Sequence, residues 1–388
     1  MKRVTETRVQ TRISTSELER RWKAVRQAMK KEDIDFLVMQ NFTDILGGYV
    51  KWFTDMSPRN NYPFTVLFPR DDDMTIIQHG PQAVRRSVRP GMKKEIGVPD
   101  LPTLSFSNTF EAEIVAEELA QYKKCHIGLL GLGFMQAAFY NHFTRRLDSA
   151  KFTDASDLVD NIKAIKSEEE IRLITETAHL QDATFEYSLT TIKPGRRNFE
   201  IYADVMHQIL KTGSSQANLM VGSAPAGTPA RLGAADRMIQ QGDQVSILIE
   251  SNGPNGLYTE IMGTICLGEI PSELQKDYET AQKAQEMALK LLKPGVTPSV
   301  VWEANNEFLR TAGYPEEKRL LWHGMGYDMV ERPSVQLGET MKIQAGMNIA
   351  VHATASSDKA AGQVCENYLV TETGYRRLHK TPQRIYVV

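Results

Sequence analysis

Ionisable side chains that could bind a metal or transfer protons lie inside apolar segments in the second half of the chain. Glu250 ends the apolar run that begins at Val245, and Glu260 follows after a Gly-Pro-Asn-Gly turn. The turn predicts a hairpin, which would place the two carboxylates on paired strands as near neighbours. Burial of a carboxylate is costly unless it is paired or bound to a metal, so the pair indicates a functional site.

Two histidines and a third carboxylate extend this pattern further along the chain. His352 ends an apolar run, His323 precedes glycines that allow close backbone approach, and Glu366 lies inside an apolar strand. Each of them alone is more typical of an ion pair or a hydrogen-bonded core group. As a set, the five residues could hold a divalent metal, either iron, manganese or zinc: Glu250, Glu260, His323, His352 and Glu366. Without a metal, repulsion would raise the pKa of at least one carboxyl group, which suits acid–base catalysis.

The composition excludes several other kinds of protein. The chain has 388 residues, 41% of them hydrophobic, which is enough for two globular domains. The 46 basic and 48 acidic residues leave no basic excess for nucleic acid, and three widely spaced cysteines exclude a disulfide framework and indicate a reducing compartment. The N-terminus lacks a signal sequence, and the longest apolar run is too short for a membrane span. We therefore expect a cytoplasmic protein that acts on a small molecule and binds neither nucleic acid nor membrane.

Alternating helix and strand patterns must position the ionisable residues. A helical pattern over residues 16–31 precedes short apolar runs of strand type, the first at 34–40, which predicts an α/β domain with a partly parallel sheet. A Ser-x-x-Glu capping box at Ser167 then opens a long amphipathic helix. We expect one domain over residues 1–160 and a second over 161–388.

The second part contains an internal repeat. Lys-Pro-Gly at 193–195 recurs at 293–295, and an Ile-Gln-x-Gly motif followed by an apolar strand occurs at Ile239 and again at Ile343. Two copies about 100 residues apart are too few and too long for a solenoid, so they predict one domain with pseudo-two-fold symmetry.

These motifs together resemble the creatinase / aminopeptidase P / prolidase superfamily, whose catalytic domain has the pita-bread fold. The resemblance covers most of the chain, and its remaining motifs are Lys-Ser-x-x-Glu at 166–170, Gly-Asp-x-Val at 242–245 and His-Gly-x-Gly at 323–326. It implies an N-terminal creatinase-type α/β domain that serves dimerisation and shapes the pocket. It also implies a C-terminal pita-bread catalytic domain and a homodimer.

The resemblance includes departures at the site itself. Peptidases of this superfamily bind two metal ions through two aspartates, a histidine and two glutamates. The corresponding positions hold Glu250, Glu260, His323, His352 and Glu366 in that order. An upstream histidine is missing, with Arg231 near its position, and Val330 replaces a further histidine. Because an imidazole cannot bridge two ions as a carboxylate does, one divalent metal and a metal-free site are both expected ahead of a two-metal site.

The resemblance and the altered set predict an enzyme that acts on a small carboxylate-bearing molecule. The reaction would be hydrolysis of a non-peptide C–N bond or a related lyase step. An Xaa-Pro metallopeptidase is one alternative, and a catalytically silent binding protein on the same fold is another.

Expected roles can be assigned to individual residues. Creatinase cleaves a small amidino compound without a metal, so we expect His352 as the base, Glu260 or Glu366 as its partner, and His323 as a further catalytic residue. Arg231 would bind a substrate carboxylate through its guanidinium group. Tyr258 beside Glu260, and Trp52 in an aromatic loop of the first domain, are expected in the substrate pocket.

Overall fold

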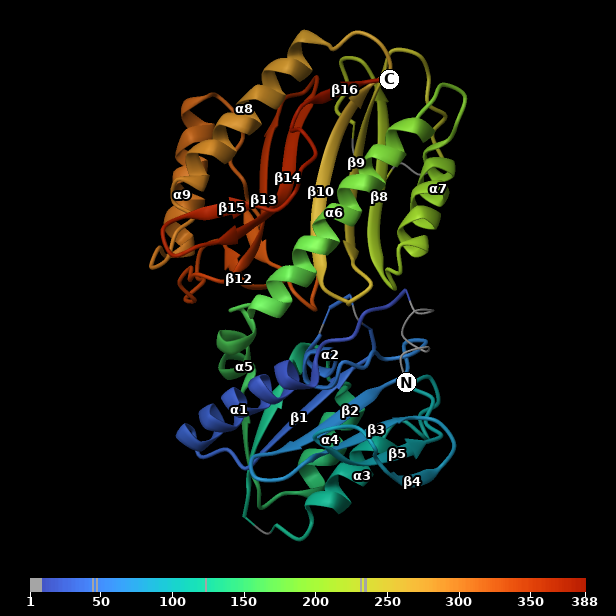
Figure 1. Ribbon diagram of the computed structural model, residues 1–388, viewed down its shortest axis with the longest axis vertical. Helices are drawn as coiled ribbons and strands as arrows, with labels where there is room; N and C mark the ends of the chain where they lie inside the picture. The colour runs from blue at the N-terminus through green and yellow to red at the C-terminus, as the bar shows by residue number, and fades with distance from the viewer. Residues whose placement is uncertain (1–8, 44, 47, 123, 231, 234–235) are drawn as a thin grey trace. The chain divides into compact units, whose positions relative to one another are not determined.

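The computed structural model describes residues 9–388 except 44, 47, 123, 231, 234 and 235. The chain divides into two compact units, Arg12–Lys163 and Ala164–Val388, and residues 9–11 belong to the second unit. The division lies close to the expected boundary after residue 160. Both units are mixed α/β structures, as predicted (Figure 1).

A seven-stranded sheet forms the centre of the first unit, in the order β4-β5-β3-β2-β1-β6-β7. Its strands are β1 (Phe36–Asn41), β2 (Phe64–Pro69), β3 (Met74–His79), β4 (Ala83–Arg86), β5 (Met92–Val98), β6 (His126–Leu130) and β7 (Lys151–Asp154). The helices are α1 (Thr15–Lys31), α2 (Tyr49–Thr54), α3 (Phe110–Leu119), α4 (Ala137–Arg146) and α5 (Ser156–Lys163). β6 pairs in parallel with β1 and with β7, and β3 with β5, so the sheet is partly parallel as expected.

The aromatic segment that was expected to be a loop forms the short helix α2. Trp52 on this helix is 1% exposed, packs edge-on against Phe53 and has the Arg21 guanidinium over its ring at 5.2 Å from the centroid. Trp52 is therefore a core residue of the first unit, in contrast to its expected place in a substrate pocket.

A buried carboxyl group lies on α3 of the first unit. Glu111 is 3% exposed, accepts a hydrogen bond from Gln40 Nε2 at 3.0 Å, and also accepts one from the Thr65 hydroxyl. Burial raises the pKa of Glu111 to about 8, although these hydrogen bonds lower it. At neutral pH this carboxyl group is therefore protonated.

Glu111→Gln should remove a pH dependence of stability. The folded chain retains a proton that the unfolded chain loses above about pH 4.5, so the free energy of unfolding falls as the pH rises from there to about 8. Glutamine carries no titrating proton, so the free energy of unfolding of the variant should not fall over this pH range. At pH 8 it should therefore be larger than that of the wild type by a few kcal/mol, on the order of 1 kcal/mol for each pH unit above about 4.5. Urea unfolding of both chains at pH 5 and pH 8 measures this. An equal pH dependence in the two chains would contradict it.

The second unit contains two sheets of similar construction (Figure 1). The first copy consists of α6 (Glu168–Thr191), α7 (Asn198–Lys211), β8 (Ala217–Pro225), β9 (Asp243–Asn252) and β10 (Tyr258–Cys266). The second consists of α8 (Ser272–Leu289), α9 (Pro298–Thr311), β11 (Trp322–Gly324), β12 (Glu331–Val335), β13 (Asn348–Ser356), β14 (Ala361–Val370) and β15 (Tyr375–Arg377). The strand orders are β16-β10-β9-β8 and β12-β11-β13-β14-β15, with β16 (Ile385–Val387) returning to the first sheet. Two helices followed by strands in each copy confirm the predicted repeat.

Helices cover one face of each sheet in the second unit. Val245, Ile247 and Ile249 of β9 pack against α6 and α7, and β13 and β14 pack against α8. Side chains alternate along a strand, so every second residue of these strands points away from the helices. We call this opposite face of each sheet the inner face. β10 and β14 lie side by side, so the inner faces of the two sheets adjoin.

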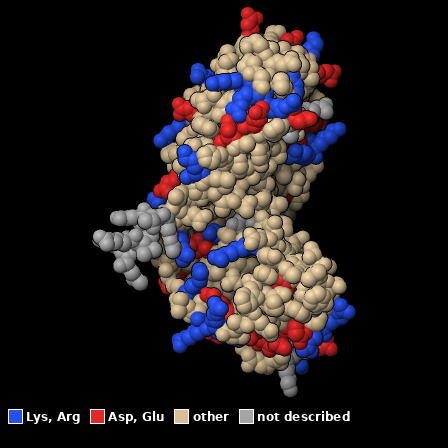
Figure 2. Space-filling model, turned by 90° about the vertical axis from the view of Figure 1, so that its right-hand side faces the viewer, with Lys and Arg blue, Asp and Glu red and all other residues tan. Residues whose placement is uncertain are grey.

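The surface carries charges of both signs. Lys and Arg side chains are interspersed with Asp and Glu on both units over the face drawn in Figure 2. This agrees with the near balance of 46 basic and 48 acidic residues. In the described part of the chain, no helix combines the length and the apolar character that a membrane span needs.

Candidate active site

The β9–β10 hairpin brings Glu250 and Glu260 together. The two residues are direct partners in the antiparallel register, and each is 4% exposed on the inner face. Asn218 of β8 is the partner of Glu250 on the other side, and its Nδ2 donates a hydrogen bond to Glu250 Oε2 at 2.9 Å. The predicted proximity of the two carboxylates is thus confirmed.

Two imidazoles approach Glu260 from the second sheet. His352 Nε2 lies 3.2 Å from Glu260 Oε1, and His323 Nε2 lies 3.5 Å from Glu260 Oε2. Their ring centroids are 5.0 Å apart. Gly324 must follow His323 because β12 passes so close that a Cβ there would lie 2.5 Å from the carbonyl oxygen of Arg332. The glycine of the His-Gly-x-Gly motif thus lets the strand that carries His323 pack against its neighbour.

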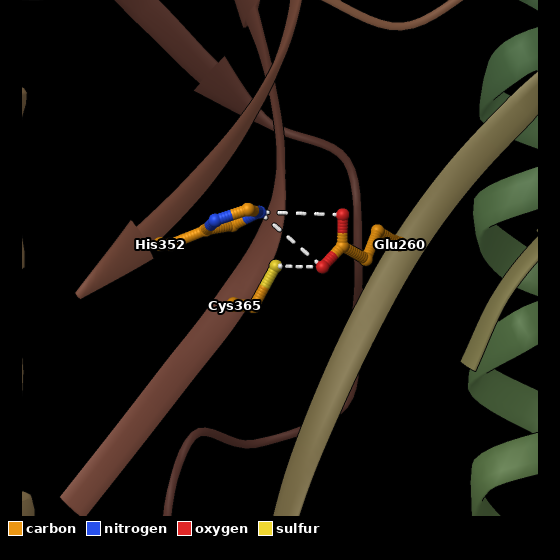
Figure 3. A group of neighbouring side chains, drawn as sticks. All are labelled: Glu260, His352 and Cys365. Atoms are coloured by element: carbon orange, nitrogen blue, oxygen red, sulfur yellow. Dashed lines mark hydrogen bonds and ion pairs between the residues drawn. The ribbon is translucent and has the colours of Figure 1, made fainter. Parts of the chain in front are cut away.

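Cys365 is the third group from the second sheet that contacts Glu260. It is the direct partner of His352 in the β13–β14 register, and side chains opposite each other in this register lie on the same face. Its Sγ donates a hydrogen bond to Glu260 Oε1 at 3.1 Å (Figure 3). No motif or spacing in the sequence points to Cys365.

Glu366 is not part of this group. Its register partner is Val351, so it lies on the face covered by α8. There its carboxylate accepts hydrogen bonds from Arg377 Nε at 2.6 Å, Gln383 Nε2 at 2.7 Å and the Tyr368 hydroxyl at 3.0 Å. A shift of one residue along a strand moves a side chain to the other face, and this places Cys365 where the motifs predicted Glu366.

The five inner-face residues that converge in this way form what we call the inner-face cluster: Glu250, Glu260, His323, His352 and Cys365. Burial and the charge of Glu260 raise the pKa of Glu250 to about 8. Burial would also raise the pKa of Glu260, but His352 and His323 outweigh it and hold that pKa well below its usual range. Burial and Glu260 raise the pKa of the Cys365 thiol. The cluster therefore holds one ionised carboxylate next to a carboxyl group and a thiol that retain their protons.

The donor atoms of the cluster fit a divalent cation. They form two triads that share Glu260, one with Glu250 and His323 and the other with His352 and Cys365. Within each triad the potential ligand atoms lie within 4.8 Å of one another. Carboxylate oxygen, imidazole nitrogen and thiolate sulfur all bind zinc or iron.

An open cleft lies along the same strands as the cluster, and none of the five cluster residues lines it. Its volume is about 1340 Å³, and Thr354 and Gln363 line it, each two residues from His352 or Cys365 along the same strand. Residues two apart on a strand share a face, so the cleft continues the surface on which the cluster lies. The His352 side chain is 24% exposed, whereas the other four residues are 3–5% exposed. His352 is thus the member of the cluster that solvent reaches most easily.

The remaining expected residues have different positions. Tyr258 is fully buried and packs with Met325 and Ala350, so it lies in an apolar group and not on the cleft surface. Arg231 lies outside the described residues. Arg237 does line the cleft, where its guanidinium is bound by the Asp243 carboxylate and the Ser223 hydroxyl. No sequence pattern singled out Arg237 or Asn218.

Known proteins share this fold and resemble the whole chain. The crystal structure of an X-Pro aminopeptidase from Thermotoga maritima has a TM-score of 0.79 at 20% identity, covering 95% of this chain and 99% of that one. The crystal structure of dipeptidase PepE from Mycobacterium ulcerans has a TM-score of 0.78 at 21% identity, and the match covers 97% of this chain and 100% of that one. By sequence, the uncharacterised hydrolase/peptidase y4tL of Sinorhizobium fredii is 26% identical over 96% of this chain and 97% of its own length. An Xaa-Pro dipeptidase from Pyrococcus horikoshii is 24% identical over 88% of this chain and 99% of its own length.

One family accounts for these likenesses and for the motifs in the sequence. The sequence pattern of metallopeptidase family M24 matches residues 172–372, a segment that spans more than half of the chain and contains the whole inner-face cluster. The superfamily and the pita-bread fold that the motifs implied are both confirmed. The chain therefore belongs to metallopeptidase family M24.

Proposed function

We propose that this protein is a hydrolase that cleaves a C–N bond of a small, carboxylate-bearing molecule at the inner-face cluster. The observation that carries the proposal is the convergence of two imidazoles, a thiol and a second carboxyl group on Glu260, on strands whose continuation lines an open cleft. Membership of family M24 supports an enzyme. Relatives named as hydrolases or peptidases support hydrolysis over the lyase step.

Hydrolysis adds a hydroxyl group to carbon and a proton to the departing nitrogen. A divalent cation bound by the cluster would polarise the scissile group and lower the pKa of a water molecule. Glu250, which is held by Asn218 and retains its proton, can give that proton to the departing nitrogen. The His323 imidazole, which faces Glu260, can take the proton of the attacking water. In a metal-free reaction, His352 would take that proton, because it is the exposed imidazole and faces Glu260.

Two substrate classes fit this chemistry, and different observations support them. The named relatives support Xaa-Pro dipeptides, since an Xaa-Pro dipeptidase is among them. The ligands on β13 and β14 support a non-peptide amide or amidine. There the cluster contains His352 and Cys365, whereas the peptidases of the superfamily are expected to use two glutamates. We take the non-peptide substrate as the first candidate and the dipeptide as the second.

A substrate panel tests the proposal. The purified chain would be incubated with Xaa-Pro dipeptides and with amidino acids such as creatine, in zinc, manganese or EDTA, and new amines would be followed by NMR. We expect kcat/KM for a non-peptide compound to exceed that for the dipeptides by about 100-fold or more. A preference for the dipeptides would establish the second candidate. Absence of any product from folded protein would reject the hydrolase.

A further inference from the structure

Three side chains from three different strands meet at one point in the cluster (Figure 3). Cys365 Sγ and His352 Nε2 lie 3.1 Å and 3.2 Å from the same oxygen of Glu260. Tetrahedral zinc has metal–ligand distances of about 2.0–2.3 Å, so neighbouring ligand atoms are about 3–4 Å apart. The separations from Glu260 fit one small ion between the three donors.

The strands hold these donors in place before any ligand binds. β13 and β14 pair continuously from Asn348–Leu369 to Ser356–Ala361, and this register fixes His352 opposite Cys365. Glu260 is anchored separately, because its backbone N–H donates to Asn367 Oδ1 at 2.6 Å. Donors on paired strands are more precisely placed than donors on loops.

The chemistry of the donors discriminates between metals. Soft thiolate and imidazole ligands favour zinc and similar ions, whereas sites made of carboxylates suit manganese. The cluster contains sulfur and nitrogen on β13 and β14, where the two-metal peptidases of the superfamily are expected to have carboxylates. Three protein ligands also leave one position of a tetrahedral ion for water or substrate.

We propose that Glu260, His352 and Cys365 form a site for one thiophilic divalent cation of the zinc class, with the Cys365 thiolate as a ligand. Glu250 and His323 lie outside this set of three, which leaves them available for proton transfer. The proposal rests on the proposed function only because it concerns the same inner-face cluster. The kind of metal that it predicts does not depend on which substrate the protein cleaves. Binding replaces the hydrogen bond from the thiol to Glu260 and releases the thiol proton.

Titration with Cd²⁺, followed by the ultraviolet charge-transfer absorption of cadmium–thiolate bonds, tests the site in the full-length, metal-stripped chain. We expect a band that saturates at one equivalent and is absent from Cys365→Ser. The affinity of that variant should fall by about 100-fold or more, beyond the 10- to 100-fold that is typical of losing an outer-shell partner. Cys266→Ser is the matched control, because Cys266 is also buried on a strand of this unit but belongs to neither donor triad. This control should retain the band.

Each outcome decides the question. Cadmium binding without the band in the wild type, or a band that persists in Cys365→Ser, would overturn the proposal. If Cys365→Ser does not fold, His352→Ala keeps the thiol and should still weaken binding by a similar factor. If the cadmium–thiolate band forms but no compound of the substrate panel is hydrolysed, the metal site stands and the proposed function is rejected. If a compound is hydrolysed but the band does not form, the proposed function stands and the metal site is rejected.

Discussion

Glu260→Gln is expected to lower kcat/KM by about 10³-fold, because the carboxylate that organises the cluster loses its charge. Glu260 faces both imidazoles and accepts the hydrogen bond from Cys365. Glutamine has the same size but carries no negative charge that could attract a cation. A positioned acid–base group is worth about 10²- to 10⁴-fold in rate, and Glu260 also holds its neighbours in place.

The measurement compares kcat/KM of the wild type and the variant on the best substrate of the panel. Circular dichroism and urea unfolding would verify that the variant folds. Activity within about 10-fold of the wild type would show that Glu260 is not central to the reaction.

Glu366→Gln is expected to lower the free energy of unfolding and to leave kcat/KM nearly unchanged. Its carboxylate is 3% exposed and bound to Arg377, Gln383 and Tyr368 on the face covered by α8. Loss of one partner of a fully buried ion pair costs about 3–5 kcal/mol. Because the Arg377 side chain is 34% exposed, we expect a smaller decrease in the free energy of unfolding, about 2 kcal/mol.

The two glutamine variants form a matched pair, since each removes one charge from a strand of the second unit. Urea unfolding and kcat/KM would be measured for both under the same conditions. We expect Glu366→Gln to retain kcat/KM within about 3-fold, below the smallest effect typical of a lost acid–base group. A loss of activity as large as that of Glu260→Gln would mean that Glu366 takes part in the reaction.

The features that the sequence predicts well are those with a local cause. A short turn fixes the register of β9 and β10, and this allowed the proximity of Glu250 and Glu260 to be predicted. The repeated motifs likewise predicted two similar halves, and the capping box at Ser167 is present at the start of α6. In each case neighbouring residues determine the structure.

The choice between Cys365 and Glu366 depends on pairing that the sequence does not reveal. Side chains alternate with a period of two, so an error of one residue in the β13–β14 register reverses which of the two residues lies beside His352. Motif matching selected Glu366 because a carboxylate was expected there. The burial of Trp52 and the hydrogen bond from Asn218 to Glu250 similarly arise from tertiary packing, which no local pattern encodes.

The most direct test of the inner-face cluster is the metal content of purified, untagged protein by elemental mass spectrometry. The measurement would include the wild type, Glu260→Gln and Glu366→Gln, purified in parallel. The geometry of the cluster predicts one divalent cation per chain in the wild type and in Glu366→Gln, and a loss of most of it in Glu260→Gln. Metal that is retained in Glu260→Gln but lost in Glu366→Gln would contradict this assignment and place the site on the other face of β14.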